Sequence, residues 1–102
     1  MDKIDFDSFM AFCKRMEGQK LPTAGGRAEF TLESVQNEKL FFVPRSGKPR
    51  HHQKRYIESV LDHHARTGSL SPSDYRDVTR NASYILALVK RYVLKSSPYL
   101  NP

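Results

Sequence analysis

The densest group of side chains suited to ligand binding lies between residues 44 and 55. This basic segment, Pro-Arg-Ser-Gly-Lys-Pro-Arg-His-His-Gln-Lys-Arg, contains five Lys or Arg, two His and no Asp or Glu. Lys and Arg attract phosphate oxygens, and backbone N–H groups at Ser46 and Gly47 can approach the same anion. Cations on a flexible loop bind phosphates without reading bases. The sequence predicts phosphate contacts from Arg45, Lys48, Arg50, Lys54 and Arg55.

The charge of the chain is unevenly distributed. Residues 1–43 contain six Lys or Arg and seven Asp or Glu, whereas residues 44–102 contain eleven Lys or Arg and four Asp or Glu. The net charge of the whole chain is +6. A surface so strongly positive repels itself unless a polyanion neutralises it, and nucleic acid is a common polyanion for a small basic domain. This pattern predicts a class of partner and not a reaction.

Four histidines form two adjacent pairs, His51-His52 and His63-His64. Two metal ligands on one helix need a spacing of three or four residues, because neighbouring side chains point in different directions. No Cys or acidic cluster accompanies either pair. We expect no metal and no cofactor, with the first pair on the basic surface and the second pair on the outside of a helix.

Carboxylates suited to a metal-dependent nuclease are present, Glu29 with Glu33 and Asp74 with Asp77. The first pair alternates with Arg27 and Thr31, as on an ordinary solvent-facing strand. The chain has no Gly-rich phosphate motif before a helix, no nucleophile elbow and no zinc-protease motif. We therefore expect a binding protein without catalytic residues.

A single domain with one hydrophobic core is expected from 102 residues, of which 38% are hydrophobic. Cys13 is the one cysteine, and its apolar surroundings predict a buried thiol in a chain from a reducing compartment. The first residues do not resemble a secretory signal, and the longest apolar run, 85–89, is too short to cross a membrane. We expect a cytoplasmic protein without membrane contact.

The first helix is predicted at residues 6–17, where apolar side chains recur at helical spacing. Asp5 is the expected N-cap and Gly18 the expected stop. Residues 19–26 contain Pro22 and a glycine pair, so no regular element is expected there.

A β-hairpin is predicted next, because the apolar pattern changes to a period of two from residue 27. Residues 27–33 and 40–43 are the expected antiparallel strands, with a loop of about four residues at 36–39. Pro44 should end the second strand, and residues 46–49 should turn the chain so that the cations of the basic segment project from a loop.

Two further helical segments are predicted. Apolar side chains recur at helical spacing over 53–66, and Gly68 should end this helix. Another helix should begin at Ser71-Pro72, which combines an N-cap residue with a proline at the first helical position. Helical spacing continues to about residue 95. We expect a break near 79–81, since Thr and Asn bond their own backbone, with one unbroken helix as the alternative. The tail, 96–102, is expected to be frayed.

The segment 70–93 predicts a helix-turn-helix-like unit. Tyr75 and Val78 would face inward from its first helix, and Ile85, Leu86 and Val89 from its second. The start of the second helix would place four side chains in a nucleic-acid groove: Arg80, Asn81, Ser83 and Tyr84. Further along the same helix, Lys90 and Arg91 would contact phosphates. The alternative is a core helix of an α+β domain.

Part of this segment, 75–78 followed by 83–89, resembles the winged-helix modules of the selenocysteine-specific elongation factor. The resemblance covers about a quarter of the chain, and it implies binding to an RNA hairpin.

The sequence as a whole predicts one α+β domain with an N-terminal helix, a hairpin, and two or three helices. We expect it to bind DNA, through the basic segment on phosphates and the helix-turn-helix-like unit in a groove, with a homodimer possible. RNA binding is one alternative. A protein-interaction module that uses Phe41, Tyr92 and Tyr99 is the other.

Overall fold

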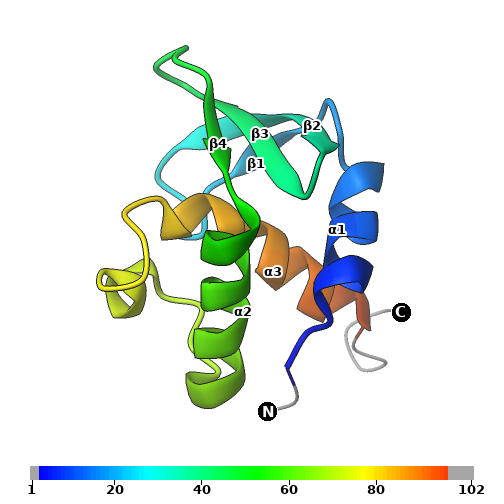
Figure 1. Ribbon diagram of the computed structural model, residues 1–102. Helices are drawn as coiled ribbons and strands as arrows, with labels where there is room; N and C mark the ends of the chain where they lie inside the picture. Colours follow the sequence, from blue (N-terminus) through cyan, green and yellow to red (C-terminus); the bar gives the residue numbers. More distant parts are fainter. Residues whose placement is uncertain (1–2, 97–102) are drawn as a thin grey trace.

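A four-stranded antiparallel sheet forms one layer of the computed structural model, and the helices pack as a second layer against one face of the sheet (Figure 1). The structure describes residues 3–96. The strands follow the order β1-β2-β3-β4, with bounds Lys20–Pro22, Glu29–Gln36, Lys39–Pro44 and Arg50–His52. The helices are α1 (Phe6–Arg15), α2 (Lys54–Thr67) and α3 (Ala82–Ser96), and Pro72–Tyr75 forms the 3₁₀ turn η1. The predicted α+β class is confirmed.

The first two helices form where helical spacing predicts them. The side chain of Asp5 accepts a hydrogen bond from the Ser8 backbone N–H at 2.9 Å and so caps α1. At the end of α2, Gly68 adopts a φ of 69° and donates its N–H to the His64 carbonyl at 2.7 Å. A side chain at that position would be strained, which explains why the helix ends there.

The hairpin between β2 and β3 is tighter than predicted. Gln36 pairs with Lys39, so the connection consists of Asn37 and Glu38, with φ values of 54° and 60°. Two consecutive positive φ values are typical of the two-residue turn whose twist matches that of the strands. The expected four-residue loop is therefore a two-residue turn.

The prediction that 19–26 contains no regular element is wrong at Lys20–Pro22, which forms the edge strand β1. Pro22 pairs opposite Glu29 at the end of this strand. A proline is tolerated there because the missing N–H removes little from the ladder of an edge strand.

A second unpredicted edge strand, β4, begins inside the basic segment. The β3–β4 loop therefore consists of residues 45–49, and Arg50 belongs to a strand. His52 pairs opposite Leu40 and is only 2% exposed, with its ring stacked 4.8 Å from that of Phe42. The prediction that His52 joins the basic surface is wrong, because the register of β4 turns this side chain into the core.

The predicted break near 79–81 is confirmed. The expected helix after Ser71 is only the four-residue turn η1, and α3 begins at Ala82. The Thr79 hydroxyl accepts the Asn81 backbone N–H at 3.3 Å, the local competition that favours a break.

The core lies between the sheet and the helices, and α3 runs through it. The side chains of α3 are buried from Ile85 to Val89, and Phe9, Phe30, Phe42 and Tyr75 surround them. His64 is also buried, at 2% exposure, so the prediction that it lies on the outside of a helix is wrong. Its place beside Val60 and Leu61 on the apolar face of α2 is the reason.

None of the helices within residues 3–96 has the length and apolar content needed to cross a membrane. The predicted frayed tail falls mostly on 97–102, outside the described residues.

Candidate nucleic-acid interface

The two cationic stretches meet at one hydrogen bond. Arg50 of β4 donates from Nη1 to the side-chain oxygen of Asn81 at 3.0 Å, across 31 residues of sequence. Arg50 pairs opposite the buried Phe42, so its side chain leaves β4 on the helix side of the sheet. Since β4 is an edge strand, the side chain can reach the turn before α3.

An open cleft of about 360 Å³ lies at this meeting point. We call it the β4–α3 cleft, and it is lined by His51, His52, Tyr56, Thr79, Arg80 and Asn81. Its walls come from β4, the first turn of α2 and the turn before α3. They offer a guanidinium, a carboxamide and hydroxyl groups, which are groups that bind phosphate and the polar edges of bases.

The start of α2 adds positive potential beside this cleft. Gln53, the N-cap residue, makes no side-chain capping bond, and the first turn of α2 contains no acidic residue. Arg55 lies over the Tyr56 ring at 4.6 Å and donates to its hydroxyl at 2.8 Å. The partial positive charge of the helix N-terminus is therefore not neutralised by a carboxylate from its own first turn.

His52 contributes a neutral ring to the cleft. Burial lowers the pKa of His52 from 6.5 to about 4, and the nearby charges of His51 and Arg50 contribute to this decrease. A hydrogen bond with the main chain of Asn81 raises the pKa but does not offset the burial. Its Nε2 has no hydrogen-bond partner within the described chain. The positive charge around the cleft at neutral pH therefore comes from arginines and not from this imidazole.

The β3–β4 loop continues the positive surface. Arg45 and Lys48 are exposed on it, and neither forms an ion pair within residues 3–96. Arg45 also lines a shallow depression of about 470 Å³ on the opposite, outer face of the sheet, together with Lys20.

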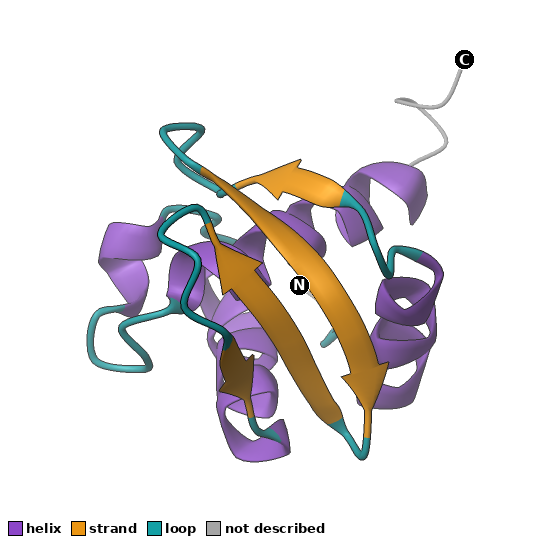
Figure 2. Cartoon of the chain, turned by 90° about the horizontal axis from the view of Figure 1, so that it is seen from above, coloured by secondary structure: helices purple, strands orange, loops and turns teal. Residues whose placement is uncertain are grey.

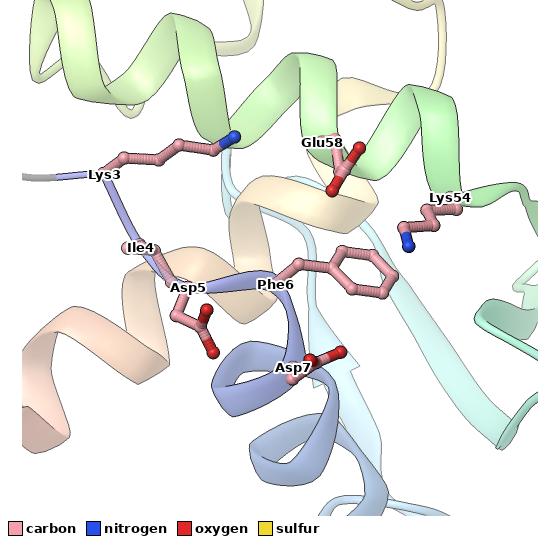
Figure 3. A pocket seen from close by; sticks show the side chains of 7 residues that line it. All are labelled: Lys3, Ile4, Asp5, Phe6, Asp7, Lys54 and Glu58. Atoms are coloured by element: carbon pink, nitrogen blue, oxygen red, sulfur yellow. The ribbon is translucent and has the colours of Figure 1, made fainter.

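Lys54 is separated from the other predicted phosphate ligands. Its ammonium group pairs with Glu38 at 2.9 Å and lies 4.9 Å from the centre of the Phe6 ring. The hydrogen bond to Glu38 raises the pKa of Lys54. Figure 3 shows Lys54 at a second surface, the α1–α2 hollow, which is lined by Lys3, Ile4, Asp5, Phe6, Asp7, Lys54 and Glu58. Its charge is compensated there.

The predicted groove residues at the start of α3 divide into two groups. Arg80 and Asn81 both line the cleft, and Arg80 is exposed. The Tyr84 ring, in contrast, lies 5.2 Å from that of Phe30 and 4.6 Å from that of Phe42, against the sheet. The Ser83 carbonyl accepts the Ala24 N–H at 3.1 Å. Both of these residues are half-buried and position the start of α3.

Lys90 and Arg91 lie further along α3. They line a hollow of about 180 Å³ with Pro22, Thr23 and Leu94 among its neighbours. From Ala82 to Arg91 an α-helix advances about 14 Å. The structure thus brings Arg50, Arg55, Arg80 and Asn81 together, places Arg45 and Lys48 on the adjoining loop, and separates Lys54, Lys90 and Arg91.

Sequence reasoning missed Tyr56, Thr79 and His52 as cleft residues. Tyr56 belongs to the helix predicted over 53–66 and Thr79 to the break predicted near 79–81, and neither pattern marks a ligand contact. The absence of an acid between Gln53 and Tyr56 was the available indication that this helix start faces an anion.

Comparisons of the chain with protein-family models, with curated proteins and with solved structures give no match. Within residues 3–96, no three His, Cys, Asp or Glu side chains are grouped so that they could hold a metal ion.

Proposed function

We propose that this domain binds DNA through the β4–α3 cleft and the cations on either side of it. The observation that supports the proposal most directly is the Arg50–Asn81 hydrogen bond, at 3.0 Å. It joins the basic segment to the turn before α3, so that cations distant in sequence can contact one nucleic-acid backbone.

Five cations would contact phosphates in this proposal. Arg45 and Lys48 would act from the β3–β4 loop, and Arg50, Arg55 and Arg80 from the edge of the cleft. None of the five forms an ion pair with a carboxylate among the described residues, so a polyanion would not have to displace one. Their exposure gives sequence-tolerant affinity and fast association.

Asn81 would add the polar contact inside the cleft. Its side-chain oxygen is occupied by Arg50, which leaves its NH₂ group to donate to a phosphate or to a base acceptor. Tyr84, packed on Phe30 and Phe42, would fix the turn that carries Asn81 and Arg80. A winged-helix or helix-turn-helix mode of base reading stays a prediction.

The test is a salt titration with a fluorescently labelled random DNA duplex. Five neutralised phosphates should give log K against log salt a slope of roughly −4.5. Changing Arg45, Lys48 and Arg80 together to Glu should reduce that slope by about three and weaken binding to all sequences alike.

Arg66→Glu is the matched control, because Arg66 is exposed at the opposite end of α2 from Arg55. It should leave the slope unchanged. Affinity that does not depend on salt, or equal losses in the triple variant and in Arg66→Glu, would contradict the proposal. Stronger competition by an RNA hairpin than by the duplex would reassign the ligand to RNA.

A further inference from the structure

The outer face of the sheet is open. Figure 2 looks onto this face, and the helices lie behind it. Paired residues share one face of an antiparallel sheet. The register therefore gives two neighbouring rows on the outer face: Lys20, Thr31 and Val43 in one, and Ser34, Phe41 and His51 in the other.

An aromatic pair occupies the second row. The rings of Phe41 and His51 have centroids 5.7 Å apart and planes 31° apart. His51 is exposed and Phe41 is partly exposed, although neighbouring side chains on the other face of the same strands, such as Phe42 and His52, are buried. Two adjacent rings on an open sheet form a surface on which nucleobases can stack, since every base has a π-face.

Cations surround this aromatic pair. Lys39 lies two residues before Phe41 on the same face of β3, and Arg45 follows the strand at its other end. Lys20 and Arg45 border the outer depression of about 470 Å³, with Thr31 of β2 between them. Glu29 of β2 also lines this depression, whereas β3 and β4, which carry the aromatic pair, contain no carboxylate. A negatively charged strand would therefore pass over β3 and β4.

We infer that the outer face binds unpaired DNA, with bases stacked on Phe41 and His51 and phosphates directed to Lys39, Arg45 and Lys48. This inference rests on the proposed function and names its substrate class, a DNA with an unpaired segment. Strand β4 borders both surfaces: Arg50 leaves it toward the cleft, and His51 stands beside Phe41 on the outer face and also lines the cleft. One ligand can therefore contact both.

A protein partner fits this face less well. The apolar side chains of β3 that point outward are Phe41 and Val43, and cations flank them. Stable protein interfaces usually have a larger apolar centre from which charge is depleted. Tyr92, the second aromatic residue expected on a protein-binding surface, packs instead against Phe9 and Phe12, and Tyr99 lies outside the described residues.

The experiment compares labelled oligothymidylate with a duplex of equal length, using fluorescence anisotropy. Phe41→Leu keeps an apolar side chain without the π-face, and Phe41→Tyr keeps the ring. Phe41→Leu should weaken single-strand binding about tenfold and change duplex binding less than about twofold. Phe41→Tyr should bind like the unchanged chain. Leu94→Ala removes an exposed apolar side chain on α3 and should have no effect.

Circular dichroism and thermal unfolding should first show that each variant folds. Photo-crosslinking with bromodeoxyuridine should then place the adduct on the β3–β4 peptides.

Unchanged single-strand affinity in Phe41→Leu, or equal losses on both substrates, would overturn the inference. Tighter binding of oligouridylate than of oligothymidylate would overturn the assignment to DNA. Salt-sensitive duplex binding without any single-strand binding would refute this inference alone, whereas no binding to either would refute the proposed function as well.

Discussion

Lys54 and Arg55 are neighbours at the start of α2, yet they belong to two surfaces of different composition. Lys54 faces the α1–α2 hollow, where Asp5, Asp7 and Glu58 accompany it, and it pairs with Glu38 at 2.9 Å. Arg55 lies over Tyr56 beside the β4–α3 cleft, which no carboxylate lines. One surface balances its charges internally, and the other does not.

This difference shows that the number of cations in a segment is a poor measure of its free charge. The basic segment contains no acid, but the fold brings Glu38 from the β2–β3 turn to Lys54. Exposed pairs of this kind add little stability and still reduce the potential available to a ligand. The cleft is the surface where a polyanion would gain most.

The largest expected difference between the two surfaces appears in their response to acid. The pKa of His52 is lowered from 6.5 to about 4 in the folded chain. The unfolded chain therefore binds the proton more tightly, so the stabilising effect of neutral His52 is complete above pH 6.5 and is lost as the pH falls toward 4. The total loss should be about 3 kcal/mol in the free energy of unfolding. Urea denaturation at a series of pH values measures it.

The control for this prediction is His52→Phe, which keeps a ring against Phe42 and removes the titrating group. Burial also lowers the pKa of His64, so part of the acid sensitivity should remain in the variant. The hydrogen bond from the Ser8 backbone N–H lowers the pKa of Asp5 in the hollow, so this carboxylate should be protonated only in stronger acid than His52. If His52→Phe has the same pH profile as the unchanged chain between pH 6.5 and 4, His52 is not the cause.

Neutralising one cation on each surface should affect DNA binding differently. Arg80→Gln should weaken duplex binding by roughly fivefold to tenfold at low salt and reduce the magnitude of the salt slope by about one, because one phosphate contact is lost. Lys54→Gln should leave the slope unchanged, because its charge is already paired with Glu38. Equal slope changes in the two variants would mean that the two surfaces do not differ toward DNA.

The elements with long periodic patterns could be predicted from the sequence, and the short ones could not. α1, α2 and the β2–β3 hairpin each contain enough residues to show a period. β1 and β4 have three residues each, too few for any alternation, and they exist because a neighbouring strand offers hydrogen bonds. His52 is buried because it pairs opposite Leu40 in the sheet, and the sequence around His52 does not reveal this pairing.

The candidate site was predictable as a list of cations but not as a surface. Arg50, Arg80 and Asn81 were expected to contact nucleic acid, and the hydrogen bond that joins two of them depends on how β4 and α3 are placed. The orientation of Tyr84 was missed for a related reason. All residues of α3 from Ile85 to Val89 are buried, because the sheet covers one side of this helix and other helices cover further sides. The buried face of α3 is therefore wider than a single apolar row, and it includes Tyr84 at its start.

The smallest expected effect concerns the contact that joins the two cationic stretches. Asn81→Ala removes the acceptor for Arg50 and leaves the charge of Arg50 in place. Duplex binding should weaken only about threefold, because a long side chain must then be ordered when the ligand binds. A double-mutant cycle with Arg50→Ala gives the decisive measurement. Once Arg50 is absent, Asn81→Ala should cost less than it does in the unchanged chain, whereas strictly additive losses would mean that the two side chains contribute to DNA binding independently.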